Sequence, residues 1–264
     1  MGCGLLLWIG NASPVEIVKI LDRLEEHKLA GEPSPVGGHG AGIALIANCD
    51  FNILKVGGVD GPSRKLAMKL GKLSKTYPII LGHVRRASKE FLKSIPYSWA
   101  AQPYACKCLE NKVVSIHNGL IENYNELYRL TSGHVYESYN PGIISSIIDS
   151  EVIPHVYSDF LKTGNIEDAT KNLYNIIKGN NTWITLAIIR EEIYAGIYHK
   201  GKTRGLNVYT SKDKLIAVTR AEALEKPLED MRKEVEIKPK EEACVLLLYE
   251  IIFNEEETEI KKIL

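Results

Sequence analysis

The sequence lacks net charge and long apolar runs. Lys plus Arg number 33 and Asp plus Glu number 33 among 264 residues, so no excess charge attracts nucleic acid or an anionic membrane surface. No apolar run approaches the roughly 18 residues of a membrane span. The apolar start, Leu5–Ile9, has no basic region before it and is too short for a signal-peptide core. We therefore expect a cytoplasmic protein with neither nucleic acid nor membrane as a partner.

A disulfide framework is also missing. The five cysteines are an odd number and lie scattered along the chain. Cys106 and Cys108 alternate along an expected strand, so their side chains point to the same face. The pair lacks the second ligand cluster that a structural zinc site requires. We interpret both cysteines as structural, and we expect no metal and no cofactor.

What is present is enough apolar sequence for one sizeable core. With 45% hydrophobic and 25% charged residues, we expect a single domain over residues 1–264 with no synthase domain. Apolar patterning predicts helices at 14–28, 62–75, 122–131, 142–161 and 166–178. It predicts strands at 3–10, 42–47, 52–56, 77–84, 104–109, 112–117, 183–190, 193–199, 206–211, 214–219, 233–238 and 244–252.

The order of these elements favours an α+β fold. A strand-rich start, a helical middle and a strand-rich end lack the regular alternation of a doubly wound sheet. The last six strands are expected to form a β-meander, and 254–257 a polar turn. We predict two antiparallel sheets with helices outside them.

Cys3 stands unusually close to the start of the chain. If Cys3 became the first residue, its α-amine, with a pKa of about 7.7–8.0, would lie beside its own thiol. Such an amine can take the thiol proton and activate the nucleophile without a histidine. Alternatively, Cys3 is an ordinary buried cysteine at the head of a strand.

Three later stretches carry residues suited to amide chemistry, although each has an ordinary structural reading. Arg85 follows a strand and offers a fork for a carboxylate, or is simply solvated. Asn118-Gly119 is either a turn or an oxyanion hole, in which the asparagine amide and a backbone N–H meet one oxygen. Asp149 lies on a solvated helix face or holds a substrate ammonium group.

Taken together, these stretches resemble class II glutamine amidotransferase domains. These are the glutaminase domains of amidophosphoribosyltransferase, glucosamine-6-phosphate synthase, glutamate synthase and asparagine synthetase. The similarity spans about residues 3 to 220, and a set of motifs in register is far more specific than any one of them. The matching stretches are Cys3-Gly4, Gly82–Arg85, Ala101–Tyr104, His117–Tyr124 and Asp149–Glu151.

The resemblance implies a four-layer αββα sandwich of the N-terminal-nucleophile (Ntn) hydrolase type and hydrolysis of the glutamine side-chain amide. It implies that Cys3 is the nucleophile and that the α-amine of Cys3 is the base. Asn118 and Gly119 would stabilise the oxyanion. Arg85 would pair with the α-carboxylate of glutamine, and Asp149 would hold its α-ammonium group.

The sequence departs from the family pattern at three places. Gly2 stands between Met1 and Cys3, so either Met1-Gly2 is removed or the protein is not an ordinary N-terminal nucleophile enzyme. The loop Gly38–Gly42 lacks the usual Asp-Ser, and we interpret its His39 as structural rather than as a catalytic base. An aromatic residue is usual where this chain has Arg86.

Three functions stay open at this stage. The chain is a glutaminase subunit that supplies ammonia to a synthase partner or within a homo-oligomer, a self-sufficient hydrolase of glutamine or γ-glutamyl compounds, or a catalytically silent relative. Gly2 favours the silent relative. The presence of Arg85, Asn118, Gly119 and Asp149 together favours the two enzymes, because a silent protein has no evident need of all four.

Overall fold

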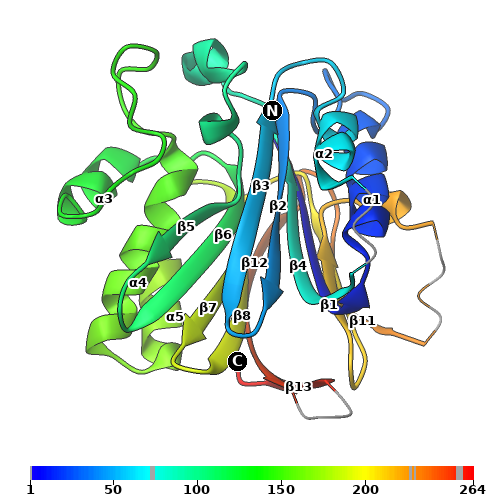
Figure 1. The fold of residues 1–264 in the computed structure, drawn as a ribbon, viewed down its shortest axis with the longest axis vertical. Coiled ribbons are helices and arrows are strands. Elements are labelled where there is room, and N and C mark those ends of the chain that lie inside the picture. The colour runs from blue at the N-terminus through cyan, green and yellow to red at the C-terminus, as the bar shows by residue number, and fades with distance from the viewer. Residues whose placement is uncertain (1, 72–74, 226–227, 229, 254–257) are drawn as a thin grey trace.

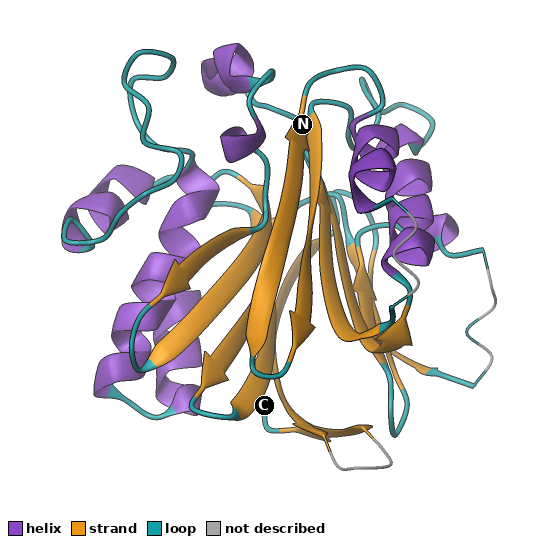
Figure 2. Cartoon of the chain, in the orientation of Figure 1, coloured by secondary structure: helices purple, strands orange, loops and turns teal. Residues whose placement is uncertain are grey.

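Two antiparallel sheets stack face to face between two outer layers of helices (Figures 1 and 2). This is the arrangement in the computed structural model, which describes residues 2–71, 75–225, 228, 230–253 and 258–264. Within that described part of the chain, no helix is long and apolar enough to cross a membrane.

Seven described strands form the first sheet, in the order β11-β9-β10-β1-β4-β2-β3. Their bounds are Gly4–Ala12 (β1), Gly40–Ala47 (β2), Asp50–Gly57 (β3), Tyr77–Val84 (β4), Leu206–Thr210 (β9), Leu215–Val218 (β10) and Arg232–Ile237 (β11). Six described strands form the second sheet, in the order β13-β12-β8-β7-β6-β5. Their bounds are Tyr104–Lys107 (β5), Asn111–Gly119 (β6), Asn181–Ile189 (β7), Glu192–Lys202 (β8), Glu242–Phe253 (β12) and Thr258–Lys262 (β13).

Three apolar layers hold the sandwich together. Side chains from the inner faces of both sheets form the central core. Helices α1 (Pro14–Glu26) and α2 (Pro62–Leu70) cover the outer face of the first sheet. Helices α3 (Tyr124–Leu130), α4 (Val152–Thr163) and α5 (Ile166–Ile176) cover that of the second. The predicted four-layer αββα fold is confirmed.

Helix α1 contains the contacts that its cap and its apolar spacing predicted. The hydroxyl of Ser13 accepts a hydrogen bond from the backbone N–H of Val15 at 3.3 Å, and Pro14 occupies the first turn. Ile17 and Leu21, one turn apart, are buried against the first sheet. The helix therefore begins where it was predicted, and it ends two residues early at Glu26.

The predicted meander is wrong in one respect, because its strands divide between the two sheets. Strands β7, β8 and β12 join the second sheet, whereas β9, β10 and β11 join the first. The reason lies at the centre of the first sheet, where β10 pairs with β1 and Leu6 faces Val218 across the strands. The N-terminal strand is thus held by neighbours more than 200 residues away, as well as by β4.

The predicted helix over 142–161 is also wrong in its first half. Residues 132–148 form turns, a short 3-10 turn follows at Asp149–Glu151, and α4 begins only at Val152. Pro141-Gly142 is a turn-forming pair, and it begins the stretch with a turn instead of a helix. Ile144 and Ile148 pack into a separate small apolar cluster.

Smaller differences concern element ends. Helix α2 ends at Leu70 because Gly71 adopts a φ of +60°, and the rest of the helix predicted to 75 falls partly on 72–74, outside the described residues. Strand β13 was not predicted, and the predicted polar turn at 254–257 also lies outside the described residues.

Candidate functional site

Cys3 lies directly before β1, at the end of the sandwich that also carries the loop between β4 and β5 (Figure 1). Its backbone N–H donates to Asn118 Oδ1 at 2.8 Å. Its thiol accepts a hydrogen bond from the backbone N–H of Arg86 at 3.3 Å. Burial raises the pKa of the thiol, while that N–H and the charge of Arg85 act in the opposite direction. The structure thus fixes Cys3 between β4 and β6, whose sequences lie far from it.

Asn118 and Gly119 end strand β6. Asn118 Oδ1 is taken by Cys3, and Asn118 Nδ2 is buried without a hydrogen-bond partner among the described residues. Gly119 has a φ of +150°, and a Cβ atom there would clash with Asn181 Oδ1 and Asn180 O. A buried amide donor that lacks a partner is costly, and it belongs to the same side-chain amide that holds the Cys3 backbone nitrogen.

Arg85 and Asp149 are buried on the same side of the fold. Arg85 is 4% exposed and directs Nη2 to Ser94 Oγ at 2.8 Å, whereas its Nη1 has no partner among the described residues. Asp149 is 5% exposed, and its Oδ2 accepts from Ile121 N at 3.0 Å. Both charges act on the Cys3 thiol. All five predicted site residues therefore gather at one end of the sandwich.

Sequence reasoning missed the polar network that supports this site. Gln102 accepts from His117 N at 2.6 Å and donates from Nε2 to His117 O and Ser150 Oγ, both at 3.1 Å. The His117 ring contacts Ser150 Oγ and Asn181 Oδ1, each at 2.8 Å. These bonds join β6 and β7 to the turn that carries Asp149. Gln102, His117 and Ser150 stood inside quoted motifs, but nothing in the sequence linked them to one another.

His39 supports the loop that contacts the thiol. Its Nδ1 accepts from Ala87 N at 3.1 Å, and its Nε2 lies 3.1 Å from Arg86 Nη1. Burial, followed by the charges of Arg86 and Arg85, lowers the pKa of His39 to about 4. These contacts agree with its interpretation as a structural loop residue.

A pocket of about 610 Å³ adjoins the site, and Asn118, Gly119 and Arg204 are among the residues that line it. Gly2 is buried against two of them. A Cβ atom on Gly2 would clash with Asn118 Oδ1 and would lie 3.1 Å from Arg204 Cγ. Gly2 thus fills the space between two side chains of the pocket wall, next to the Cys3 nitrogen.

Comparison with known proteins agrees with this arrangement. No family model matches the chain. The isomerizing glutamine–fructose-6-phosphate aminotransferase of Pyrococcus horikoshii is 35% identical over 190 residues, which are 70% of this chain and 27% of that protein. The enzyme of the same name from Thermococcus kodakarensis is 32% identical over 192 residues, 71% of this chain and 27% of that protein. The chain spans about a quarter of the length of these curated relatives.

The solved structures share the fold. Glutamine phosphoribosylpyrophosphate amidotransferase from B. subtilis, complexed with ADP and GMP, aligns with a TM-score of 0.63 at 19% identity. A second structure, described as the allosteric regulatory enzyme of purine biosynthesis, gives a TM-score of 0.66 at 19% identity. Each match covers 98% of this chain and 49% of the other. By its sequence relatives and its fold, this chain belongs to the family of class II glutamine amidotransferase domains.

Proposed function

We propose that the chain hydrolyses the side-chain amide of glutamine through a thioester on Cys3. The observation that carries the proposal is the different bonding of the two side-chain polar atoms of Asn118. Its Oδ1 is held by the Cys3 nitrogen at 2.8 Å, and its buried Nδ2 is left to donate to a substrate. A donor fixed in advance beside a nucleophile is what an oxyanion hole requires.

The reaction proceeds in two steps with water as the final acceptor. The Cys3 sulfur attacks the amide carbon, and the free α-amine of Cys3 takes the thiol proton. Asn118 Nδ2 and the Gly119 N–H stabilise the oxyanion. The amide nitrogen leaves as ammonia with the proton returned by the α-ammonium group. Water then attacks the thioester, which releases glutamate and restores the thiol.

Two buried charges suit the ends of the amino acid. Arg85 Nη1 has no partner among the described residues and is free to bind the α-carboxylate. Asp149 keeps only one oxygen on a backbone N–H, that of Ile121, with Ser150 Oγ at 3.4 Å from the other. A carboxylate so placed suits an α-ammonium group.

The mechanism requires cleavage of the bond between Gly2 and Cys3. While that bond is intact the Cys3 nitrogen is an amide, which is no base at neutral pH. Gly2 also fills the space between Asn118 and Arg204. We propose that removal of Gly2 both creates the base and opens the pocket toward Cys3. If the bond stays intact in the cell, the chain is a silent relative that keeps the pocket.

The destination of the ammonia is a further proposal. The relatives are named as aminotransferases, and the chain spans about a quarter of their length. We propose that a synthase on a partner chain, or another copy in a homo-oligomer, receives the ammonia. A self-sufficient hydrolase of glutamine or γ-glutamyl compounds is the alternative, and addition of candidate partners separates the two if one of them stimulates ammonia release. A cytoplasmic location stays a prediction.

Three forms of the chain test the proposal: the unaltered sequence, a deletion of Gly2 and Cys3→Ala. Intact mass gives the N-terminal residue of each, and ammonia release from glutamine gives the activity. We expect activity wherever Cys3 is the first residue, labelling of Cys3 by a diazoketone analogue of glutamine, and no activity in Cys3→Ala. A folded protein with a free N-terminal Cys3 that releases no ammonia would overturn the proposal. Activity with Gly2 still attached would overturn the role of the α-amine.

A further inference from the structure

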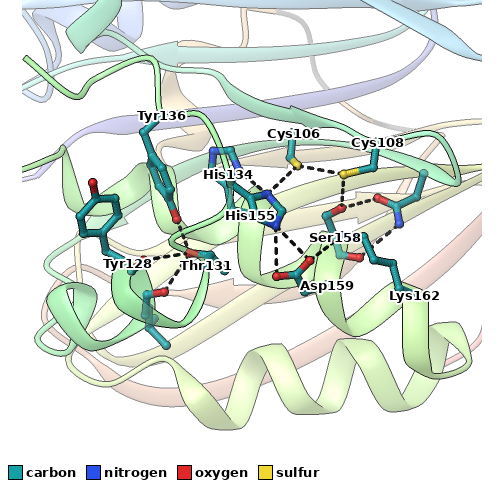
Figure 3. A network of polar contacts seen from close by, with 12 residues as sticks. Cys106, Cys108, Tyr128, Thr131, His134, Tyr136, His155, Ser158, Asp159 and Lys162 are labelled. Atoms are coloured by element: carbon teal, nitrogen blue, oxygen red, sulfur yellow. Dashed lines mark hydrogen bonds and ion pairs between the residues drawn. The ribbon is translucent and has the colours of Figure 1, made fainter.

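Four side chains in the network of Figure 3, none of them among the proposed site residues, bring two sulfur and two ring-nitrogen atoms together. Cys106 Sγ lies 3.6 Å from Cys108 Sγ and 3.4 Å from His134 Nδ1. His134 Nδ1 lies 3.0 Å from His155 Nδ1. The ligand atoms of the first three residues all lie within 4.8 Å of one another. We call these four residues the Cys/His cluster.

Three spacings within the cluster match a tetrahedral metal site, whereas His155 Nδ1 lies more than 4.8 Å from at least one of the two sulfurs and has to turn toward them when the ion binds. Zinc bonds to thiolate sulfur at about 2.3 Å and to imidazole nitrogen at about 2.0–2.1 Å. Around one tetrahedral ion, those lengths separate two sulfurs by about 3.8 Å, a sulfur and a nitrogen by about 3.5 Å, and two nitrogens by about 3.3 Å. The three closest distances in the cluster, 3.6, 3.4 and 3.0 Å, each fall within a few tenths of an ångström of these values.

The hydrogen bonds around the two histidines also call for a cation. The Asp159 carboxylate can only accept, and it lies 3.0 and 3.1 Å from His134 Nε2, so that nitrogen carries the hydrogen and Nδ1 of the neutral ring presents a lone pair. His155 Nε2 is buried without a hydrogen-bond partner among the described residues, 4.0 Å from a Glu151 oxygen.

Neither tautomer of His155 satisfies its surroundings. With the hydrogen on Nδ1, the buried Nε2 lone pair faces the Glu151 carboxylate. With the hydrogen on Nε2, two Nδ1 lone pairs, from His134 and His155, face each other at 3.0 Å. Either a metal ion bound to both Nδ1 atoms or a second proton on His155 removes the conflict, and the two thiols beside His134 favour the metal ion.

Outer contacts of the kind found around metal ligands are present as well. Asp159 orients the His134 ring, and Lys162 in turn bonds to Asp159 at 2.7 Å. Ser158 Oγ donates to Cys108 Sγ at 3.3 Å. Carboxylate–histidine pairs and hydrogen bonds to thiolates fix the first ligands and tune their basicity.

We propose that Cys106, Cys108, His134 and His155 bind one zinc ion. Both thiols lose their protons to solvent as the two zinc–sulfur bonds form, so two thiolates balance the charge of the ion and no oxidant or reductant is needed. Four protein ligands leave no open position, which makes the site structural and independent of the glutaminase reaction. The two-cysteine, two-histidine donor set favours zinc.

The ligands come from three parts of the second sheet and its helices. Cys106 belongs to β5, the strand at one edge of the sheet, and Cys108 follows it directly. His134 lies in the irregular stretch after α3, and His155 lies in the first turn of α4. The ion would therefore tie a short edge strand to that stretch and to α4. We expected no metal because Cys106 and Cys108 lack a second ligand cluster of the usual spacing, and the two histidines follow Cys106 only after 28 and 49 residues.

The test measures metal content and does not depend on activity. The full chain is expressed with zinc in the medium, purified without chelator, and analysed by elemental mass spectrometry. We expect about one zinc ion per chain, which Cys108→Ser and His155→Gln each abolish. Cys244→Ser and Cys49→Ser serve as matched controls and retain the metal, because neither residue lies in the cluster. Asp159→Asn is expected to weaken zinc binding by about 10- to 100-fold.

Cobalt provides a readout that needs no variant. Replacement of zinc by Co²⁺ in the unaltered chain is expected to give intense d–d bands and thiolate-to-cobalt charge-transfer bands, as tetrahedral coordination with sulfur ligands requires. Three results would overturn the proposal: wild-type protein without zinc that gives only the weak spectrum of octahedral cobalt, a Cys108→Ser variant that keeps the full zinc content, or a Cys106–Cys108 disulfide in protein purified under argon.

Discussion

Asn118 has two hydrogen-bonding atoms with different tasks. Oδ1 fixes the Cys3 nitrogen, and Nδ2 is held without a partner among the described residues. Removing an oxyanion donor typically lowers turnover by about 100- to 1000-fold. We predict that Asn118→Asp, which keeps an acceptor for Cys3 but loses the donor, lowers kcat by at least this factor and changes KM less. Steady-state kinetics on glutamine, with Asn118→Ala for comparison, measures both constants.

The two Asn118 variants separate the two tasks. Asn118→Ala removes both atoms, so it should also loosen Cys3. The rate at which the Cys3 thiol reacts with a small alkylating reagent should then differ from the wild-type rate. Asn118→Asp should leave the position of Cys3 close to that of the wild type. Equal kcat in Asn118→Asp and the wild type would contradict an oxyanion role for this residue.

Arg85 makes a different kind of prediction. Its Nη2 is fixed on Ser94 and its Nη1 has no partner among the described residues, so the guanidinium is oriented with one nitrogen available. We predict that Arg85→Lys raises KM for glutamine by at least about tenfold with a smaller effect on kcat, because the single nitrogen of Lys cannot bond to Ser94 and face the substrate carboxylate as the two guanidinium nitrogens can. The wild type should prefer glutamine over the derivative in which the α-carboxylate is converted to an amide, and Arg85→Lys should lose this preference. A variant that discriminates as the wild type does would rule out this contact.

At the scale of elements, the close packing between the end of β6 and the start of β7 constrains the candidate site. Gly119 has a φ of +150° and lies against Asn181 Oδ1 and Asn180 O, so no side chain fits there without moving β7. We predict that Gly119→Ala destabilises the fold by about 1–3 kcal/mol and also abolishes most activity, because Asn118 and the following N–H shift together. Urea unfolding and ammonia release measure the two effects.

A second glycine in the same chain provides the control for Gly119→Ala. Gly133 has open space around its Cβ position, so Gly133→Ala should leave stability and activity close to the wild-type values. If Gly119→Ala behaves like Gly133→Ala, the close packing at the end of β6 does not constrain the site.

At the scale of the whole molecule, buried histidines make stability depend on pH. His83 lies in β4 and is fully buried, with Nε2 3.2 Å from His117 O. Burial lowers its pKa from the usual 6.5 to about 3. Between these values the unfolded chain binds the proton and the folded chain does not, so stability rises with pH across this window and is fully present above about 6.5.

We therefore predict that the melting temperature falls as pH is lowered from about 6.5 toward 4. The contribution of one such proton is at most about 1.4 kcal/mol per pH unit. Thermal unfolding of His83→Gln measured beside the wild type isolates this term, because the carboxylates are common to both. The slope of melting temperature against pH should be shallower in the variant, and parallel curves would refute the assignment to His83.

The candidate site divides into what local sequence can reveal and what it cannot. Local sequence was enough to propose Cys3, Arg85, Asn118, Gly119 and Asp149, because each sits in a short motif and the set is recognisable by its order. The network through Gln102, His117 and Ser150 was not foreseen, because no rule of spacing relates positions 102, 117 and 150 before the strands are paired.

The sequence by itself determined an α+β fold of two antiparallel sheets with outer helices and most of its elements, because apolar periodicity and helix caps act over a few neighbouring residues. The four-layer αββα arrangement was implied by the family resemblance. Only the tertiary structure decided which sheet the late strands join, since β10 pairs with β1 across more than 200 residues. It also decided that 132–148 stays irregular, with Ile144 and Ile148 buried in a separate cluster. For the same reason the Cys/His cluster was invisible in the sequence: its ligands meet only once β5, α4 and the stretch between α3 and α4 have packed together.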